Sequence, residues 1–312
     1  MRLEIVICTH NRSWLLERTL RSVARANAPS GSHLQVTVVA NHCTDDTEAM
    51  IASLKPEYPF PLRLLREPRA GKSYALNHAL TQLKGDFQIY IDDDHRVDTR
   101  FLCAIEELIQ KHPSYKIFCG RIIPDWDGEE PQWIHSEKYP VYPLPIPHYD
   151  LGQGPCEIAL DDRLPGGGNL VMAKEVTQQV GQFNENLGPS GHNLGGGEDG
   201  DYVRRALSKG YKILYHPAPI QYHWADTERL TLGYLLRKAY SRSRSAAYIQ
   251  IQQPRLPPRF LFTKLALNLC QLLLPLPLAR LRFYLMRSAS TAGEITAYTG
   301  RYRDAKSERK HG

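Results

Sequence analysis

The 312-residue chain lacks several features that would assign it to a protein class at once. Its six cysteines lie far apart with no C-x-x-C spacing, which indicates neither a zinc ribbon nor a disulfide framework and favours a reducing compartment. No cleavable export signal is visible, because MRLEIVICTH has one early basic residue and then reads directly as a strand. The stretch REPRAGKS ends like a phosphate loop, but the pattern is incomplete, because Arg66 stands where its first glycine is required.

The sequence has no uninterrupted run of about 20 apolar residues of the kind that crosses a bilayer. Its most apolar stretch, residues 259–286, is interrupted by Lys264, Gln271, Arg280, Arg282 and two prolines. Basic side chains within an apolar stretch are typical of helices that lie in a membrane interface. We expect residues 226–312 to form a helical, membrane-associated extension; a buried core hairpin or an oligomer contact also fits this composition.

Residues 1–100 alternate short apolar runs with helical patterns. Strands are predicted at 3–9, 34–41, 62–68 and 87–93, and helices at 14–26, 47–54 and 73–83. This alternation implies right-handed βαβ units and a parallel sheet. We therefore predict an α/β fold for residues 1–225, with a Rossmann-like, mostly parallel sheet flanked by helices.

Polar residues follow each of the four predicted strands, at 9–12, 41–47, 67–72 and 92–94. In open parallel sheets, ligands bind at the carboxyl ends of the strands. The recurrence of polar clusters along one edge therefore predicts a cleft of nucleotide size.

The stretch GDFQIYIDDDHRVD places Asp92, Asp93 and Asp94 directly after the fourth strand. Acidic turns are common, but three adjacent carboxylates repel one another and a cation would remove that cost. Asp92 with Asp94, or Asp93 with Asp94, offers the hard oxygen ligands that Mg²⁺ or Mn²⁺ prefers when it also bridges phosphates. On this stretch alone, an acidic turn and a metal site both remain open.

Two other stretches carry charged residues that fit either a functional site or an ordinary turn or helix start. In REPRAGKS, Arg69, Gly71 and Lys72 suit a phosphate, or they form a solvated turn before a helix. In GGGEDGDYVRRAL, Glu198 and Asp199 open an amphipathic helix, where the helix dipole also favours acidic residues.

The second half of this region is less regular. Residues 115–165 are rich in Pro, Trp, Tyr and Gly, and we interpret them as irregular strand and loop that line an acceptor pocket or serve as a connector. GGGNLVMAKEV predicts a glycine turn, a short strand and the start of a helix, and YKILYHPAPIQYHW predicts a pair of strands.

Six motifs then occur in a fixed order: VICTHNR, VVANHCTDDT, EPRAGKSYALNHAL, YIDDD, GGGNLVM and GEDGDYVRRA. Together they resemble the family 2 glycosyltransferases of the GT-A fold, over roughly residues 3–225. The resemblance implies a nucleotide-sugar donor held over the strand ends and a carbohydrate or lipid-linked acceptor.

The resemblance also implies roles for individual residues. The loop Thr9–Arg12 would wall the base and ribose, and Asn41 or Asp45 would contact the base, because Ala40 stands where the family usually has an aspartate. The donor-binding residues implied in this way are Thr9, Asn11, Arg12, Asn41, Asp45, Arg69, Lys72, Asp92, Asp93, Gly168 and Asn169.

By the same resemblance, Asp94 would bind a divalent cation, Mn²⁺ or Mg²⁺, that bridges the diphosphate. His223 is a candidate third ligand, or a packed histidine beside Trp224. A departing nucleoside diphosphate accumulates negative charge, which a cation offsets.

Asp199, with Glu198 beside it, matches the family's general base, which takes a proton from the acceptor hydroxyl while that hydroxyl attacks the anomeric carbon with inversion. A carboxylate suits this task, because the hydroxyl becomes acidic only as its bond to carbon forms and a second carboxylate raises the pKa of the base.

We therefore expect an inverting, metal-dependent hexosyltransferase of cell-surface polysaccharide biosynthesis. A sugar nucleotidyltransferase lacks support, because CTHNR replaces its glycine-rich loop after the first strand, and a non-catalytic membrane-bound scaffold would not require Asp92, Asp94 and Asp199. The net charge of +6 gathers toward the C-terminus. We expect a peripheral or monotopic protein on the cytoplasmic face of the inner or plasma membrane, with a membrane surface and no nucleic acid among its partners.

Overall fold

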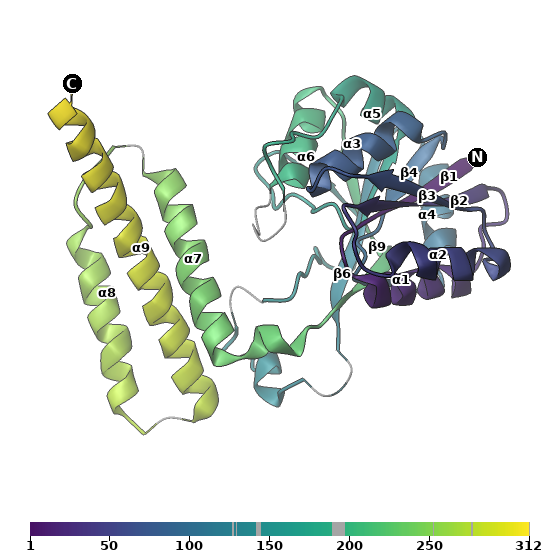
Figure 1. Cartoon of the computed structure of the whole chain (residues 1–312). Helices are drawn as coiled ribbons and strands as arrows, with labels where there is room; N and C mark the ends of the chain where they lie inside the picture. Colours follow the sequence, from purple (N-terminus) through teal and green to yellow (C-terminus); the bar gives the residue numbers. More distant parts are fainter. Residues whose placement is uncertain are drawn as a thin grey trace. The chain divides into compact units, whose positions relative to one another are not determined.

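The computed structural model of the chain describes residues 1–126, 128, 130–141, 145–188, 197–251, 253–275 and 277–311. The strands are β1 (Arg2–Thr9), β2 (His33–Asn41), β3 (Leu62–Glu67), β4 (Phe87–Tyr90), β5 (His95–Val97), β6 (Ile117–Asp125), β7 (Cys156–Ile158), β8 (Leu170–Ala173) and β9 (Ile213–Trp224). The α-helices are α1 (Ser13–Arg25), α2 (Thr47–Leu54), α3 (Lys72–Gln82), α4 (Phe101–Lys111), α5 (Lys174–Val180), α6 (Glu198–Ser208), α7 (Leu232–Gln250), α8 (Arg259–Cys270) and α9 (Leu278–His311). Figure 1 shows their arrangement.

The strands of the described residues form one sheet in the order β3-β2-β1-β4-β8-β6-β9-β5, with β7 paired to β9. β1 runs parallel to both β2 and β4, and β2 runs parallel to β3. The predicted βαβ units and parallel half of the sheet are therefore confirmed, with boundaries that agree to within three residues.

The other half of the sheet is mixed. β8 is antiparallel to β4 and β6, as the predicted short strand before a helix allows, while β6 and β9 run parallel. The prediction of two strands at YKILYHPAPIQYHW is wrong, because β9 is a single strand of 12 residues. The pairing with β6 shifts register between Cys119 and Arg121, and this irregularity accommodates the prolines of β9.

Helices cover both faces of the sheet because alternate strand residues point to opposite sides. Leu3, Ile5 and Ile7 of β1 pack in one core with residues of α1, α2 and α4. Val6 packs in a second core with residues of α3, α5 and α6. The same two groups of helices flank the sheet in Figure 1.

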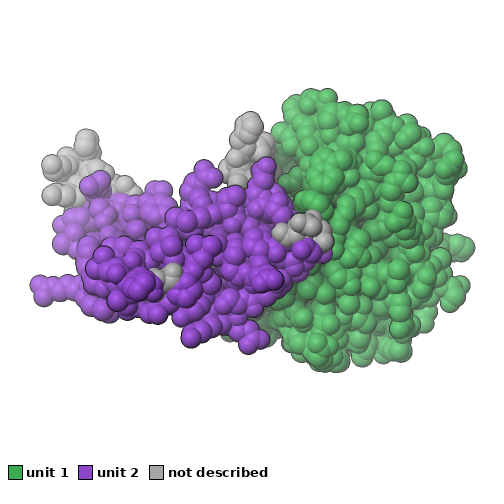
Figure 2. All heavy atoms as spheres, turned by 90° about the horizontal axis from the view of Figure 1, so that it is seen from below, with its two compact units in different colours: residues 1–125, 147–224 green, residues 126–146, 225–312 purple. Residues whose placement is uncertain are grey.

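The chain divides into two compact units, coloured separately in Figure 2. Unit 1 contains residues 1–125 and 147–224, and unit 2 contains residues 126–146 and 225–312. The expected division at 225/226 coincides with the second boundary to within one residue, whereas residues 126–146 group with the C-terminal helices. The reason is a separate apolar cluster in which Ile134 and Val141 pack with residues of α7 and α9.

The apolar stretch at 259–286 forms α8, a short 3₁₀ turn at Gln271–Leu273 and the start of α9. α9 packs against both α7 and α8. Within the described residues, no helix combines the length and apolarity needed to span a membrane.

Candidate functional site

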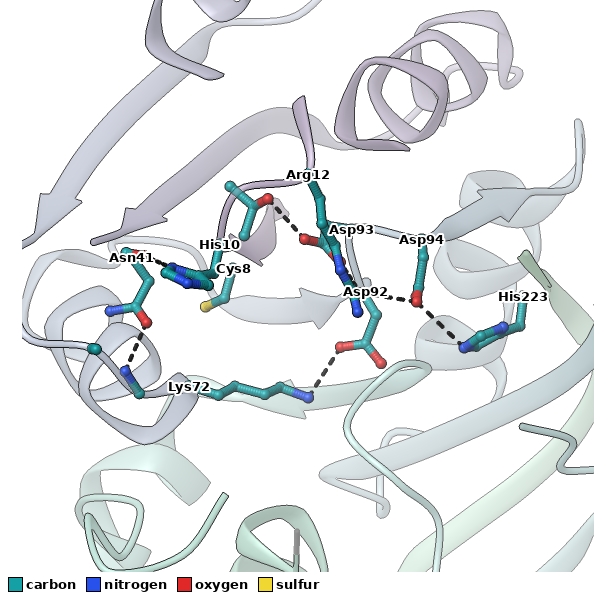
Figure 3. Close-up of a pocket in the computed structure, with 12 residues that line it drawn as sticks. Cys8, His10, Arg12, Asn41, Lys72, Asp92, Asp93, Asp94 and His223 are labelled. Carbon is teal, nitrogen blue, oxygen red and sulfur yellow. Dashed lines mark hydrogen bonds and ion pairs between the residues drawn. The ribbon is translucent and has the colours of Figure 1, made fainter. Parts of the chain in front are cut away.

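The carboxyl ends of β1 and β2, together with the segments that follow β3 and β4, surround a cavity of about 270 Å³ (Figure 3). Its described lining residues are Cys8, Thr9, His10, Arg12, Asn41, Ala70, Gly71, Lys72, Asp92, Asp93, Asp94 and His223. The parallel register brings these strand ends to one edge, so the structure places a cavity where the sequence predicts a cleft.

Asp94, His95 and His223 lie at one end of this region, and their candidate ligand atoms are all within 4.8 Å of one another. Nε2 of His223 is 3.5 Å from Oδ2 of Asp94, and Nε2 of His95 is 3.9 Å from Oδ1. The two histidines meet because β5 and β9 are antiparallel with His95 directly opposite His223. Sequence reasoning identified Asp94 and His223 but missed His95, although it immediately follows the three aspartates.

Hydrogen bonds fix the orientation of both imidazole rings. Nδ1 of His95 lies 2.6 Å from Oε1 of Gln221, and Nδ1 of His223 lies 2.8 Å from the backbone oxygen of Trp224. If each Nδ1 donates, each Nε2 presents its lone pair toward Asp94, as metal-binding histidines require.

The chemistry of these three side chains fits a divalent cation. Nε2 of His95 is buried and has no hydrogen-bond partner among the described residues, a cost that a bound cation would remove. Burial, partly offset by Asp94, keeps the pKa of His223 below its ordinary value, so its imidazole is neutral at neutral pH. The three residues therefore form a possible metal site.

Lys72 connects the cavity to the acidic start of α6. Its Nζ is 3.1 Å from Asp92, 3.5 Å from Glu198 and 3.5 Å from Asp199. Burial opposes the charge of Lys72, yet the three carboxylates raise its pKa well above the ordinary value. Burial would raise the pKa of Asp92, but the nearby Lys72, His95 and His223 together offset burial and hold that pKa below its usual range.

Two glycines allow the carboxylates to approach the backbone closely. A Cβ atom at Gly168 would lie 2.6 Å from Oδ2 of Asp92, and one at Gly167 would lie 2.5 Å from Oδ1 of Asp199. A side chain at either position would therefore displace a carboxylate that contacts Lys72. Gly195 and Gly196, which precede α6 in the motif GGGEDG, lie outside the described residues.

Asp93 is held by threonines of β1 and α1. It accepts a hydrogen bond of 2.7 Å from Thr9, and its backbone oxygen accepts one of 2.9 Å from Thr19. Burial, together with the negative charge of Asp94, raises the pKa of Asp93 to about 6. Arg12 contacts both Asp93 and Asp94.

Asn41 lines the cavity, and its side chain holds the loop between β3 and α3 in place. Its side-chain amide donates to the backbone oxygen of Arg69 at 2.6 Å, and its oxygen accepts from the nitrogen of Gly71 at 2.8 Å. Gly71 has a φ of 143°, which only glycine adopts readily.

Five predicted donor-binding residues do not line the cavity in the described structure. Asn11 and Asp45 cap backbone nitrogens of the neighbouring loop and helix. Arg69 pairs with Glu67, Asn169 donates to the backbone of Arg121 and Pro219, and Gly168 packs against Asp92. Their donor-binding role stays a prediction, and their observed contacts support the loops around the cavity.

Comparison with known proteins agrees with this architecture. The family model described as Glycosyl transferase family 2 matches residues 4–160. The succinoglycan biosynthesis protein ExoM of Rhizobium meliloti (strain 1021) is 26% identical over 241 residues, which cover 77% of this chain and 72% of ExoM. The GalNAc(5)-diNAcBac-PP-undecaprenol beta-1,3-glucosyltransferase of Campylobacter jejuni is 27% identical over 41% of this chain and 40% of its own.

Solved structures show the same fold. S. aureus TarS 1-349 has a TM-score of 0.56 and 16% identity, over 98% of this chain and 92% of that one. The mannosyltransferase PcManGT from Pyrobaculum calidifontis, in complex with GDP-Man and Mn²⁺, has a TM-score of 0.53 and 15% identity, over 98% and 75%. The expected GT-A fold is thereby confirmed. Since the family model matches half of the sequence, the chain belongs to glycosyl transferase family 2 and is a glycosyltransferase.

Proposed function

We propose that this enzyme transfers a sugar from a nucleotide-sugar donor to a growing polysaccharide or lipid-linked acceptor, with inversion and with the help of a divalent cation. The observation that carries the proposal is the convergence of two groups on one cavity. Asp94, His95 and His223 form the possible metal site, and Lys72 joins the cavity to the carboxylate of Asp199.

The names of similar proteins support the choice of substrates. ExoM is a succinoglycan biosynthesis protein, and the C. jejuni relative is named for an undecaprenol-linked acceptor. TarS has been solved with UDP-GlcNAc, and PcManGT with GDP-Man and Mn²⁺. Family membership favours glycosyl transfer over the nucleotidyl transfer that the sequence left as an alternative.

In the proposed reaction, Asp199 accepts the proton of the acceptor hydroxyl as the hydroxyl oxygen attacks the anomeric carbon. The bond from that carbon to the nucleoside diphosphate breaks on the opposite face, which inverts the configuration. Lys72 helps to hold the pKa of Asp92 below its usual range, and its ammonium group also lies 3.5 Å from Asp199. Glu198 beside it is buried, and burial together with the charge of Asp199 raises the pKa of Glu198.

When bound by Asp94, His95 and His223, a divalent cation would offset the charge of the departing diphosphate. Two imidazole nitrogens beside one carboxylate favour a transition-metal ion such as Mn²⁺ over Mg²⁺.

The proposal is tested by thermal unfolding with a panel of UDP- and GDP-sugars, with Mn²⁺ or with EDTA. A ligand that binds the native state raises the unfolding temperature by mass action, so the true donor should raise it only when Mn²⁺ is present. Equal stabilisation by that donor in EDTA would exclude a metal-dependent enzyme. A donor that stabilises the protein but never yields nucleoside diphosphate with any acceptor would instead favour a non-catalytic scaffold.

We further propose that the enzyme works on the cytoplasmic face of the membrane, held there peripherally or monotopically by unit 2. Several large apolar side chains of α8 and the turn after it face solvent: Phe260, Phe262, Leu267, Leu269, Leu273 and Leu274. Residues 226–312 contain 16 Lys and Arg against 5 Asp and Glu, whereas residues 1–225 contain 23 against 28. Apolar side chains within a basic region suit an anionic lipid surface, and the nucleotide-sugar donor belongs to the cytoplasm.

A further inference from the structure

Arg12 sits directly on the carboxylates of the possible metal site. It precedes α1 at the end of the loop after β1, and its Nη1 is 3.2 Å from Oδ1 of Asp93 and 3.1 Å from Oδ2 of Asp94. Figure 3 shows its guanidinium between the two aspartates, within the cavity.

The oxygen of Asp94 that Arg12 contacts also faces the possible ligand His223. Oδ2 of Asp94 is 3.1 Å from Nη1 of Arg12 and 3.5 Å from Nε2 of His223. A divalent ion that shares this oxygen with His223 would lie a few ångströms from the guanidinium. At such a separation, two like charges in a partly buried site repel strongly, because solvent screens them only in part. Arg12 and the ion therefore compete for Asp94.

The contact of Arg12 with Asp93 is of a different kind. Asp93 is buried and already accepts a hydrogen bond from Thr9, so its position does not depend on Arg12 alone. The side chain of Arg12 is 42% exposed, against about 10% for the two carboxylates, which leaves the guanidinium room to change partners within the cavity.

Arg12 is also the cation in the cavity best placed to change partners. Arg12 and Lys72 are the two permanently charged cations among the described lining residues. Lys72 is held by Asp92, Glu198 and Asp199, whereas a diphosphate offers Arg12 the bidentate oxygen acceptors that guanidinium groups prefer.

We propose that Arg12 is a positioning residue that couples metal binding to donor binding: it neutralises Asp94 in the donor-free enzyme and moves to the donor diphosphate when the donor enters. The site then binds a divalent cation weakly alone and tightly together with a nucleoside diphosphate. This inference rests on the proposed metal-assisted function. Because coupling between two ligands is reciprocal, the cation raises the affinity for the nucleotide by the same factor.

The test measures Mn²⁺ affinity by electron paramagnetic resonance of the free ion, with the full chain and no nucleotide. Arg12→Gln should bind Mn²⁺ at least about 10-fold more tightly than the wild type, since it removes the competing charge. Arg12→Lys keeps the charge and should stay near the wild type. Arg21→Gln is the matched control, because it removes the same charge from an exposed pair with Glu17 on α1 and should leave the affinity unchanged.

A second measurement adds saturating UDP or GDP, with the complex of Mn²⁺ and free nucleotide included in the fit. The nucleotide should raise the Mn²⁺ affinity of the wild type, and the factor should shrink in Arg12→Gln. Equal or weaker Mn²⁺ binding by a folded Arg12→Gln protein would overturn the inference. If that variant does not fold, the inference would be overturned by a wild type whose Mn²⁺ affinity does not change when nucleotide is added. A wild type that binds no Mn²⁺ under any condition would overturn the proposed metal dependence itself.

Discussion

His95 shows how much of the candidate site depends on one hydrogen bond. Its ring is buried, and its Nδ1 contacts Gln221, which is fully buried and also donates to the backbone oxygen of Tyr90. Gln221 therefore fixes which nitrogen of His95 faces Asp94. Outer partners of this kind typically matter for metal affinity by factors of about 10 to 100.

We expect Gln221→Met, which keeps the shape but removes the acceptor, to weaken Mn²⁺ binding by about 10-fold to 100-fold. Calorimetric titration of Mn²⁺ measures this change. Tyr215→Phe is the control, because it removes a partly buried hydrogen bond to Asp150 that lies away from the cavity. Unchanged affinity in Gln221→Met, with binding abolished in His223→Ala, would mean that His95 is packed and does not ligate.

A substitution at Asp199 distinguishes donor binding from the chemical step. Asp199→Asn preserves the shape of the side chain but cannot accept the acceptor proton, so turnover should fall by about 100-fold to 10,000-fold while donor affinity stays within a few-fold. Single-turnover sugar transfer and donor binding, measured on the same preparation, check this. A parallel collapse of donor affinity would show that Asp199 contacts the donor, and full activity would move the base to Glu198 or Asp201.

At the residue scale, the sequence predicts the acidic and basic groups of the site better than their partners. Asp92, Asp94, Lys72 and Asp199 belong to contiguous motifs whose spacing is informative. The position of His95 instead depends on the pairing of β5 with β9, and the contact between His95 and Gln221 joins residues 126 positions apart. No local pattern reports a contact of that range.

At the scale of elements, α8 is unusual because large apolar side chains on it face solvent. Leu261 and Asn268 are its buried residues, whereas Phe260 and Leu267 are 63% and 62% exposed. Replacing exposed apolar residues costs the fold little, since they are not part of a core. Such variants can therefore test membrane binding without removing the helix.

The double variant Phe260→Ser/Leu267→Ser should bind vesicles containing anionic lipid at least about 100-fold more weakly than the wild type in a flotation assay, because the two inserted side chains together contribute about 3–6 kcal/mol. Leu160→Ser, at a position of unit 1 that is 50% exposed, is the control and should float like the wild type. High salt should weaken wild-type binding only in part, since apolar insertion is not screened. Equal flotation of all three proteins would favour an oligomer contact for α8.

Among the elements, the first four strands were predictable because apolar runs and helical patterns alternate regularly. β9 was not, because Pro217 and Pro219 within it predict an interruption. The partner strand supplies the compensation: a Cβ atom at Gly120 would collide with the backbone oxygen of Pro219, so the glycine permits the two strands to approach. The close approach of the two strands needs both the prolines of β9 and the glycine of β6, so neither segment alone predicts it.

For the whole molecule, the assignment of residues 126–146 to unit 2 changes how the protein can be shortened. Ile134 and Val141 pack with Leu235 of α7 and Met286 of α9. A truncation after Pro258 would remove α9 and expose this apolar cluster. Unit 1 has its own two cores and does not share that cluster.

We therefore expect a chain that ends at Trp224, with residues 126–146 replaced by a flexible Gly/Ser linker, to be soluble and to unfold cooperatively. The chain truncated after Pro258 with residues 126–146 intact should aggregate. Size-exclusion chromatography and thermal unfolding distinguish the two. The opposite result would show that unit 1 needs unit 2 to fold.

The same interleaving bears on how the protein is made. Residues 126–146 leave the ribosome before the 78 residues 147–224 that complete unit 1, and only then does α7 follow. Synthesis proceeds at about 5–20 residues per second. The residues Trp126, Trp133, Ile134 and Val141 are therefore made about 4–16 s before the residues of α7 that pack against them, and longer before those of α9. During that interval this short apolar segment lacks the helices that cover it, so it is open to chaperones, proteases and premature association with a neighbouring chain.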